Sequence, residues 1–483
     1  MPGADILTVA EMTAADRRTI DAGAPGFTLM QRAGDAVAEA ITARWGPCRT
    51  LVLCGPGNNG GDGFVVAKVL AQAGYDVAVA LAGEQDALKG DAALAAGAWT
   101  GKIGPLAPSA VEGAALIVDA VFGAGLSKPV GGVIAPTLRA AEASAAPIVA
   151  VDLPSGLSGD TGRPLGYAPQ CRLTVTFHRR KIGHVLEPGR SLCGEVVVAD
   201  IGLIAEPTRL FENSPDLWLR RFPWPTTASH KHARGRLIVV SGELTRTGAA
   251  RLAARAGLRI GAGLVTLLSP PDALVVNAAH LEAVMLKPFE TDAELEAAAA
   301  DADAAVIGPA AGVDDATISN LFALVRTGAA IVIDADALTV FRDEPEELFQ
   351  VLDRDDVLTP HPGEFDRVFP GLLKSAPERI SAAREAAAKA HAVVLLKGPD
   401  TVIASPDGRC AVNMNGQPWL ATAGSGDVLA GFVGGLIAQG MDSFDAACAG
   451  VWIHAQAAAI HGVGLIAEDL PGLAPRVLEQ LRG

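Results

Sequence analysis

Residues 421–438 read ATAGSGDVLAGFVGGLIA. The small residues that end at Gly426 are expected to open a helix, so that backbone N–H groups and the helix dipole point at a phosphate without side-chain obstruction. Asp427 would then lie in the first turn, where its carboxylate can take a proton from a hydroxyl while the N–H groups stabilise the transferred phosphoryl group. This arrangement is typical of a small-molecule kinase. The alternative is a plain turn in which Asp427 only caps the helix.

The length and charge of the chain exclude several classes of protein. A chain of 483 residues is expected to form two domains. Its apolar stretches are all interrupted before the ~18 residues that a membrane span needs, and residues 1–24 carry charges without the apolar core of a secretion signal. A net charge of −15 opposes binding to nucleic acid or anionic lipid. The six cysteines include no C-x-x-C pair. We therefore expect reduced thiols in a cytoplasmic protein, with no membrane and no nucleic acid as partner.

The first half begins with a βαβ pattern. A strand, a glycine-rich loop, a helix and a second strand are expected, in this order, at residues 50–54, 55–63, 64–73 and 75–82. The loop matches the G-x-G-x-x-G pattern of dinucleotide sites. However, Asn58, Asn59 and Asp62 crowd a loop that in such sites is usually free of polar side chains. We therefore interpret these three as ligand-binding groups in their own right.

Two further loops place a carboxylate at the end of an expected strand. Asp119 follows the apolar run 115–118, and Asp152 follows 148–151, with Ser155 three residues later. In doubly wound sheets, ligands bind at the carboxyl ends of the strands, so these groups are expected to share one crevice with the first loop. One such Asp would usually be a helix cap. Several together favour a polar pocket and an oxygen-ligated cation.

Together with TVTF at 174–177, Lys181 and Gly183, these loops resemble the epimerase domain of the NAD(P)H-hydrate repair enzymes. The resemblance covers residues 7–203. It implies a Rossmann-like three-layer αβα domain that interconverts the R and S hydrates of NADH and NADPH. It also implies Asp152 as a catalytic residue and a potassium ion (K⁺) held by Asn59, Asp119 and Ser155. The substrate-binding residues that it implies are Asn58, Asn59, Gly60, Gly61, Asp62, Gly123, Ala124, Gly125, Leu126, Ser127, Lys128, Pro129 and Asp152.

The second half is again expected to be α/β. Residues 205–229 contain four prolines and no sustained periodicity, which indicates a linker or a meandering connection. A helix of small residues is expected at 248–261. Buried strands of a parallel sheet, each ending in a polar or glycine-bearing loop, are expected at 236–241, 263–268, 304–308, 330–334, 356–358 and 393–397. Ligands belong at those ends.

The motifs of these loops are DADAL at 334–338, LTPHPGE at 358–364, KGPDT at 397–401 and the helix-opening stretch at 421–438. They resemble the dehydratase domain of the same enzymes, which has the ribokinase-like α/β fold. The resemblance implies phosphorylation of the ring hydroxyl of the S hydrate and elimination of phosphate, with Mg²⁺ and with Asp427 as the base. ADP as the phosphoryl donor is inferred from the fused two-domain form. The implied nucleotide-binding residues are Lys397, Gly398, Pro399, Asp400, Thr401 and Gly426, and the implied hydrate-binding residues are Ala249, Gly312, His361 and Asp427.

We therefore expect an epimerase domain at residues 1–210 and a dehydratase domain at 217–483, in a protein that forms homo-oligomers. Trp419 stands where the family more often shows glycine, close to the phosphate loop. Two alternatives remain. The first is a ribokinase-like vitamin or sugar kinase with a fused regulatory nucleotide-binding domain, whose first-domain loops should be chemically plain. The second is a first domain that only binds an NAD-derived signal, which an assay of R-to-S interconversion would distinguish.

Overall fold

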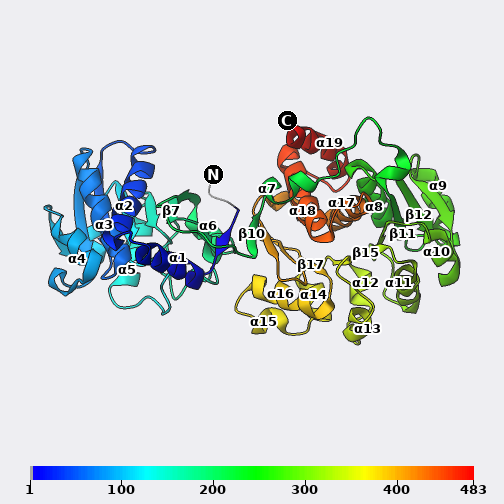
Figure 1. Cartoon of the computed structure of the whole chain (residues 1–483), viewed down its shortest axis with the longest axis horizontal. Coiled ribbons are helices and arrows are strands. Elements are labelled where there is room, and N and C mark those ends of the chain that lie inside the picture. Colours follow the sequence, from blue (N-terminus) through cyan, green and yellow to red (C-terminus); the bar gives the residue numbers. More distant parts are fainter. Residues whose placement is uncertain (1–3) are drawn as a thin grey trace. The chain divides into compact units, whose positions relative to one another are not determined.

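Parallel β-sheets with helices on both faces form each of the two units of this chain (Figure 1). The computed structural model describes residues 4–483, and the sequence boundary between the two units lies between Thr208 and Arg209. Within residues 4–483, no helix combines the length and the apolar character needed to cross a membrane. The α/β fold class expected from the sequence is confirmed in both units.

The first unit contains a seven-stranded parallel sheet. Its central strands are buried and apolar, as expected for a sheet that is covered on both faces. In spatial order the strands are β4 (Ile103–Pro105), β3 (Asp76–Leu81), β2 (Arg49–Cys54), β5 (Leu116–Ala120), β6 (Ile148–Val151), β7 (Leu173–Phe177) and β9 (Glu195–Ala199). The strand order reverses between β2 and β5, the point at which open sheets of this kind bind ligands.

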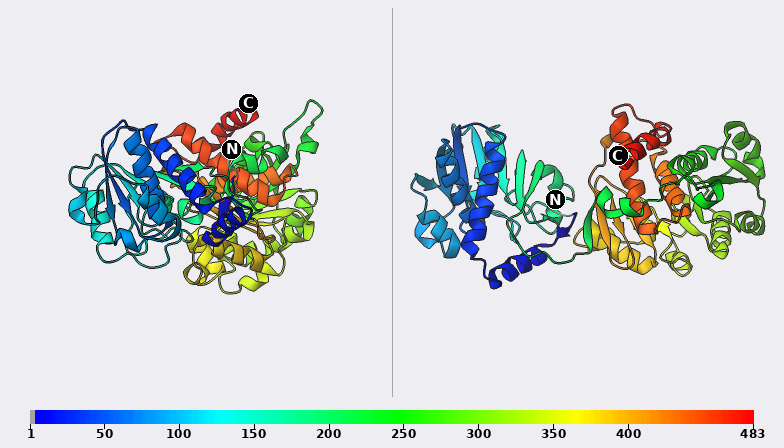
Figure 2. Two further views of the ribbon diagram at one scale, coloured as in Figure 1. Left: turned by 60° about the vertical axis from the view of Figure 1, so that its left-hand side comes forward. Right: turned by 45° about the horizontal axis from the view of Figure 1, so that its top comes forward.

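Helices cover both faces of this sheet (Figures 1 and 2). Alternate residues of β2 point to opposite faces: Val52 packs in the apolar cluster beneath α2, α3 and α4, and Leu53 packs in the cluster beneath α5. These helices are α2 (Gly26–Thr42), α3 (Asn58–Gln72), α4 (Gly90–Gly97) and α5 (Ile134–Ala143). The other elements are β1 (Ile6–Leu7), α1 (Val9–Asp21), β8 (Arg180–Lys181), which pairs with β1, and α6 (Gly189–Cys193). The unit therefore has three layers.

Helix α3 begins earlier than the sequence indicates. We expected a loop over residues 55–63, but the helix starts at Asn58. Glycine is a poor helix former, which is why the pattern favoured a loop. In the structure these glycines permit close packing: an added Cβ would lie 1.9 Å from a backbone oxygen at Gly60 and 2.6 Å from neighbouring side chains at Gly61 and Gly63. The first turn of α3 can therefore present Asn58 at the carboxyl edge of the sheet.

The second unit contains a ten-stranded sheet that is parallel except where β18 pairs with its two neighbours. In spatial order the strands are β10 (Leu210–Asn213), β19 (Cys410–Asn413), β18 (Val402–Ala404), β17 (Val393–Leu396), β16 (Val357–Leu358), β15 (Ala330–Ile333), β14 (Ala304–Ile307), β11 (Arg236–Val240), β12 (Leu264–Ser269) and β13 (Met285–Pro288). All six strands expected in this half are present. The sequence analysis missed four further strands: β10, β13, β18 and β19.

Two groups of helices cover this sheet (Figures 1 and 2). On one face lie α8 (Thr247–Ile260), α17 (Ser425–Ala438), α18 (Ser443–His461) and α19 (Asp469–Arg482). On the other lie α11 (Asp315–Thr327), α12 (Asp336–Thr339), α14 (Pro362–Val368) and α16 (Arg379–Ala390). The remaining helices are α7 (Pro215–Trp218), α9 (Pro271–His280), α10 (Asp292–Ala299), α13 (Pro345–Phe349) and α15 (Leu372–Ser375).

The segment expected to be a linker belongs in large part to the second unit. Strand β10 pairs in parallel with β19 at the edge of the sheet, and Asn213 donates a hydrogen bond to the Cys448 carbonyl at 2.8 Å. Trp218 is fully buried in the core of the unit. The unit therefore includes residues before 217, where the sequence placed its beginning. The prolines around this segment favoured a linker, and the strand that ends at the buried Asn213 was therefore not predicted.

The stretch at residues 421–438 forms the helix that was expected. Helix α17 begins at Ser425 after Gly424, whose φ of 85° is easily adopted only by glycine. An added Cβ at Gly431 would lie 2.2 Å from the Ala253 carbonyl oxygen of α8, and one at Gly434 would lie 2.7 Å from Val306 of β14. These small residues allow α17 to pack directly on α8 and on the sheet. Its first turn thereby reaches the carboxyl edge of the strands.

Candidate active sites

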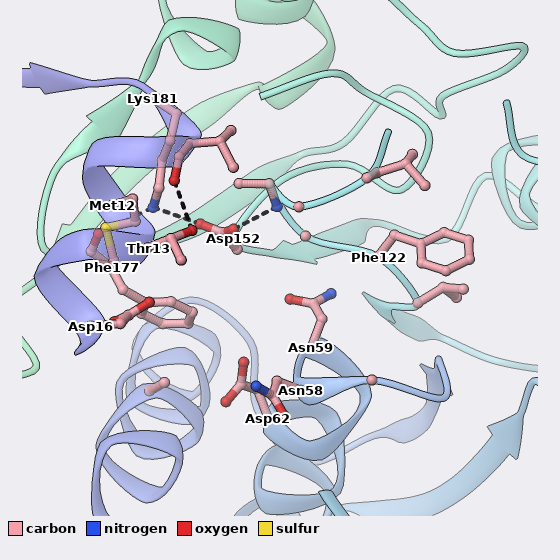
Figure 3. Close-up of a pocket in the computed structure, with 18 of the residues that line it drawn as sticks. Met12, Thr13, Asp16, Asn58, Asn59, Asp62, Phe122, Asp152, Phe177 and Lys181 are labelled. Atoms are coloured by element: carbon pink, nitrogen blue, oxygen red, sulfur yellow. Dashed lines mark hydrogen bonds and ion pairs between the residues drawn. The ribbon is translucent and has the colours of Figure 1, made fainter. Parts of the chain in front are cut away.

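A cavity of about 800 Å³ opens at the carboxyl edge of the first sheet. Its volume is in the range usual for small-molecule sites. Figure 3 shows its walls, which come from α1, the first turns of α3, the loop after β5 and the end of β7. The lining side chains with ionisable or amide groups include Asp16, Asn58, Asn59, Asp62, Asp152 and Lys181.

Asp152 is held in place from several sides. Its Oδ1 accepts hydrogen bonds from Lys181 Nζ at 2.8 Å and Thr176 Oγ1 at 2.9 Å, and its Oδ2 accepts one from the Ala124 N–H at 2.8 Å. Its φ of 67° is uncommon for a residue other than glycine. His184 Nε2 lies 2.7 Å from its carbonyl oxygen. A strained backbone of this kind persists only where its surroundings fix it, and it is frequent at functional sites.

The charge of Asp152 is determined by Lys181. The Lys181 side chain is 1% exposed, and its Nζ also donates to Thr176 Oγ1 at 2.8 Å. Burial alone would raise the pKa of Asp152, but the charge and hydrogen bond of Lys181, the charge of His184 and the hydrogen bond from the Ala124 N–H together outweigh it and lower this pKa to about 2. Burial lowers the pKa of His184 to about 4, so that its ring is neutral at pH 7. Asp152 is therefore a carboxylate at neutral pH.

Two further carboxyl groups of the cavity, Asp16 and Asp62, have pKa values shifted in the opposite direction. Burial raises the pKa of Asp62 well above its usual range, and the charges of Asp152 and Asp16 add to the rise. Burial also raises the pKa of Asp16, although Lys181 acts against it. The sequence analysis missed Asp16 as a site residue, because it lies on α1, outside every loop motif. Nothing in the sequence around Asp16 indicated a functional role for this carboxylate.

Most residues that the first resemblance implies meet at this cavity. Asn58, Asn59, Asp62, Asp152 and every residue of 123–129 line it. Gly60 and Gly61, which we expected to bind substrate, are not on its wall, because both are buried where α3 packs on its neighbours. Asp119 and Ser155 are likewise not on the wall.

Asp119 and Ser155 form a buried polar pair. Ser155 donates to both carboxylate oxygens of Asp119, from Oγ at 2.6 Å and from N–H at 2.8 Å, and Phe122 N–H donates to Ser155 Oγ at 2.8 Å. Burial raises the pKa of Asp119 to about 6, although the bonds from Ser155 lower it, and within residues 4–483 no basic side chain offsets its charge. The Asn59 side chain lies beside Gly123, and its Nδ2 is buried without a hydrogen-bond partner. A buried carboxylate without a cationic partner fits a monovalent cation, to which Asn59 could contribute only its Oδ1, because Nδ2 is a donor.

A second site lies at the first turn of α17. Lys397 Nζ is 2.7 Å from Asp334 Oδ1 and 3.8 Å from Glu364 Oε2. Asp334 Oδ1 also accepts a hydrogen bond from Thr359 Oγ1 at 2.8 Å. A Cβ added to Gly426 would lie 3.5 Å from Lys397 Nζ, so the ammonium sits directly beside the backbone of this turn. The expected neighbours Lys397 and Gly426 thus meet at an electropositive helix start.

Asp427 has the proton affinity of a general base at neutral pH. Burial raises its pKa to about 7; Asp334 adds to the rise, and Lys397 opposes it. An ordinary Asp, by contrast, is fully ionised at pH 7 and is a weak base. A carboxylate with a pKa near the working pH is the better acceptor of a hydroxyl proton.

The loop at residues 398–401 is largely held by its own contacts. Asp400 forms an ion pair with Arg379 at 3.3 Å, and Thr401 Oγ1 donates to the Gly398 carbonyl at 2.8 Å. These side chains are therefore engaged, and the loop offers a ligand mainly its backbone. Trp419, which replaces the more usual glycine, donates from Nε1 to the Ala458 carbonyl at 3.0 Å. Its indole thereby fastens the segment before α17 to α18.

His361 has a structural contact that the sequence did not indicate. Its Nδ1 accepts from the N–H groups of Gly363 at 2.9 Å and Glu364 at 3.3 Å, so that it caps α14. Only Nε2 is left for a ligand, and it lies 3.2 Å from Glu364 Oε1. The Gly312 N–H donates to Asp336 Oδ2 at 3.0 Å. Asp336 lines a hollow of about 650 Å³ and raises the pKa of Asp427.

Two family models match the chain. The model described as NAD(P)H-hydrate dehydratase matches residues 237–465, and the one described as YjeF-related protein N-terminus matches residues 26–183. A bifunctional NAD(P)H-hydrate repair enzyme of Moorella thermoacetica is 37% identical over 99% of this chain and 97% of its own length. The chain belongs to this family. A further NAD(P)H-hydrate repair enzyme, from Coxiella burnetii, is 35% identical over 94% of this chain and 95% of its own.

The fold of the second unit is confirmed by a solved structure. A ribokinase-like superfamily protein from Enterococcus faecalis superposes with a TM-score of 0.52 at 23% identity, covering 58% of this chain and 98% of its own. The repair enzymes match both units together, whereas a kinase with a fused regulatory domain would be matched over its kinase unit only. The kinase alternative is therefore less supported.

Proposed function

We propose that this chain interconverts the R and S hydrates of NADH and NADPH in its first unit and dehydrates the S form with ADP in its second. The observation that carries the proposal is the presence of two sites, each at the carboxyl edge of its own sheet and each with a carboxylate under the influence of a lysine: Asp152 with the buried Lys181, and Asp427 with the partly buried Lys397. The near full-length similarity to bifunctional NAD(P)H-hydrate repair enzymes supports it.

In the second unit, Asp427 takes the proton of the ring hydroxyl as its oxygen attacks the terminal phosphoryl group of ADP. Lys397 and the N–H groups of the first turn of α17 hold the transferred group. AMP leaves, and the hydroxyl has become a phosphate ester, which is a much better leaving group. The lone pair of the ring nitrogen expels phosphate and restores the dihydropyridine after loss of a ring proton.

The metal of this unit would accompany the nucleotide. Within residues 4–483, no three His, Cys, Asp or Glu side chains stand at metal-binding spacing. This fits Mg²⁺, which usually binds through substrate phosphates with one or two carboxylates rather than in an all-protein cage. Asp334 and Glu364, both beside Lys397, are the carboxylates that would contribute. When bound, the ion would neutralise phosphate charge.

In the first unit, we assign Asp152 as the general base. It is ionised at neutral pH, and although its pKa of about 2 makes it a weak base, a weak base suffices because water becomes strongly acidic as it adds to a C=N⁺ bond. Asn59, Asp119 and Ser155 would hold K⁺, which would supply positive charge behind the loop at 123–129. That loop lines the cavity and would contact the substrate. The cytoplasmic location and the homo-oligomer stay predictions.

The test is recovery of the dihydronicotinamide absorbance band when the protein is added to a mixture of the hydrates with ADP, and then with ATP. Recovery with ADP supports the donor that we propose. Recovery with ATP alone would change the donor, and recovery with neither nucleotide would contradict the dehydratase function.

The two activities are expected to separate when the chain is cut between Glu206 and Pro207. Each unit has its own sheet and core, the ion pair of Arg18 with Glu206 stays in the first fragment, and β10 stays in the second. The first fragment should interconvert R and S hydrates without nucleotide. The second should consume only the S form, and mixing the fragments should restore full repair.

Each fragment is assayed by chromatography of the two epimers over time. If the second fragment consumed both epimers as fast as the whole chain, the first unit would have no epimerase role. If neither fragment were soluble, the units would share a core, which would contradict the boundary.

A further inference from the structure

The cavity of the first unit holds more negative charge than it can neutralise. Four carboxyl groups (Asp16, Asp62, Asp91 and Asp152) and two lysines (Lys128 and Lys181) line it, and Lys181 forms its ion pair with Asp152 at 2.8 Å (Figure 3). Within residues 4–483, no basic side chain forms an ion pair with Asp16 or Asp62. Neighbouring carboxyl groups without a counter-charge cannot all stay ionised in a partly desolvated site. One of these two therefore carries a proton at neutral pH.

The surroundings place that proton on Asp62. Asp152 and Asp16 both repel a charge on Asp62 with nothing to offset them, whereas for Asp16 the attraction of Lys181 exceeds the repulsion of Asp152. The ionisable groups that line the cavity or act on Asp62 come from α1, β2, α4, two loops and β8. They are Asp16, Cys54, Asp91, Lys128, Asp152 and Lys181. The cavity thus holds a protonated and an ionised carboxyl group at the same time, which is the usual arrangement of an acid and a base.

We propose that Asp62 is the acid of the epimerisation and that Asp16, supplied by α1, is a positioning residue that keeps the proton on Asp62. The inference rests on the proposed epimerase function of this unit and adds a division of roles to it. Asp62 was expected only to bind substrate, and Asp16 had no expected role.

The reaction step balances without a further reactant. Asp62 gives its proton to the ring hydroxyl, the C–O bond breaks, water leaves, and the lone pair of the ring nitrogen forms the C=N bond. Water then adds to the opposite face of the ring and gives its proton to the Asp152 carboxylate, while the C=N electrons return to nitrogen. The product is the other epimer. Asp62 is then ionised and Asp152 protonated, and water in the cavity returns the proton.

The first experiment is Asp62→Asn in the full chain, assayed for R-to-S conversion. We expect a fall of ~10²- to 10⁴-fold in kcat, the usual effect of losing a general acid. Nucleotide-dependent consumption of pure S hydrate by the second unit should not change. A variant that folds, as judged by an unaltered unfolding transition, and retains near-normal epimerisation would overturn the acid role.

The second experiment measures the pH profile of kcat/KM for epimerisation in Asp16→Asn. Without the charge of Asp16, Asp62 should lose its proton more easily, so the alkaline limb should move to lower pH by about one unit. Asp21→Asn is the matched control, because Asp21 lies on the same helix but is exposed and outside the cavity. Its profile should match that of the unaltered protein.

The outcomes distinguish a failure of this inference from a failure of the proposed epimerase function. An unaltered protein that does not interconvert the hydrates would overturn the proposed function. An active protein whose profile is the same in Asp16→Asn would overturn the role of Asp16. If Asp62→Asn did not fold, the shift in Asp16→Asn would still decide whether a protonated Asp62 is required.

Discussion

Asp427→Asn is expected to lower nucleotide-dependent dehydration of the S hydrate by ~10²- to 10⁴-fold and to leave epimerisation unchanged. The substitution keeps the shape of the side chain in the first turn of α17 and removes the proton acceptor. It also removes a buried negative charge beside Asp334 and Glu364, so we expect no loss of stability. Initial rates with saturating ADP and Mg²⁺ measure the effect.

The pH dependence of the unaltered protein is part of the same prediction. The folded environment raises the pKa of Asp427 to about 7. Because a base must be deprotonated to act, kcat/KM for dehydration should rise with pH up to about 7 and then level off. Asp343→Asn, at an exposed carboxylate of the same unit, is the control and should retain both the rate and the profile. Near-normal dehydration by Asp427→Asn would refute its role as the base.

The loops that end the strands could be predicted from sequence because their chemistry is local. A glycine before a helix, a carboxylate after a buried strand and an apolar run are each visible within about ten residues. This is why the sequence alone predicts the first turn of α17 and places the carboxylates Asp119 and Asp152 at strand ends. The same reasoning predicts the six strands of the second sheet that were expected.

The features that the sequence did not predict depend on contacts between segments that lie far apart in the sequence. The pairing of Lys181 with Asp152, and the approach of Asp16 on α1 to the same cavity, arise only when the sheet brings β8 and α1 to one edge. The capping role of His361 was not visible in the sequence, because its hydrogen bonds to α14 depend on side-chain orientation, and its role in binding the hydrate stays a prediction. We predicted the start of α3 too late, because a cluster of glycines is typical of a loop when only the sequence is considered. In the structure these glycines pack closely against their neighbours.

The buried pair of Asp119 and Ser155 leads to the second prediction with a large effect. Asp119→Asn should abolish measurable epimerisation, because it removes the one formal negative charge among the three side chains that we propose hold K⁺ and so weakens binding of the ion. Asn is preferred to Ala because its Oδ1 can still accept from one of the two N–H groups, of Ser155 and of Val121, that bond to Asp119, whereas Ala would leave both without an acceptor. Dehydration of the S hydrate by the second unit should not change.

The thermal stability of the first unit, which does not depend on activity, shows whether the carboxylate of Asp119 helps to hold an ion. The first unit of the unaltered protein should unfold at a higher temperature in potassium chloride than in the same concentration of tetramethylammonium chloride, because an ion that binds only the folded state stabilises it. Asp119→Asn should lose this difference. Thr174→Val is a matched control, because its Oγ1 bonds the Cys193 carbonyl at 2.7 Å, away from the group formed by Asn59, Asp119 and Ser155. If Asp119→Asn kept epimerisation, or if the unaltered protein were equally active in both salts, these three residues would not hold a K⁺ that the reaction needs.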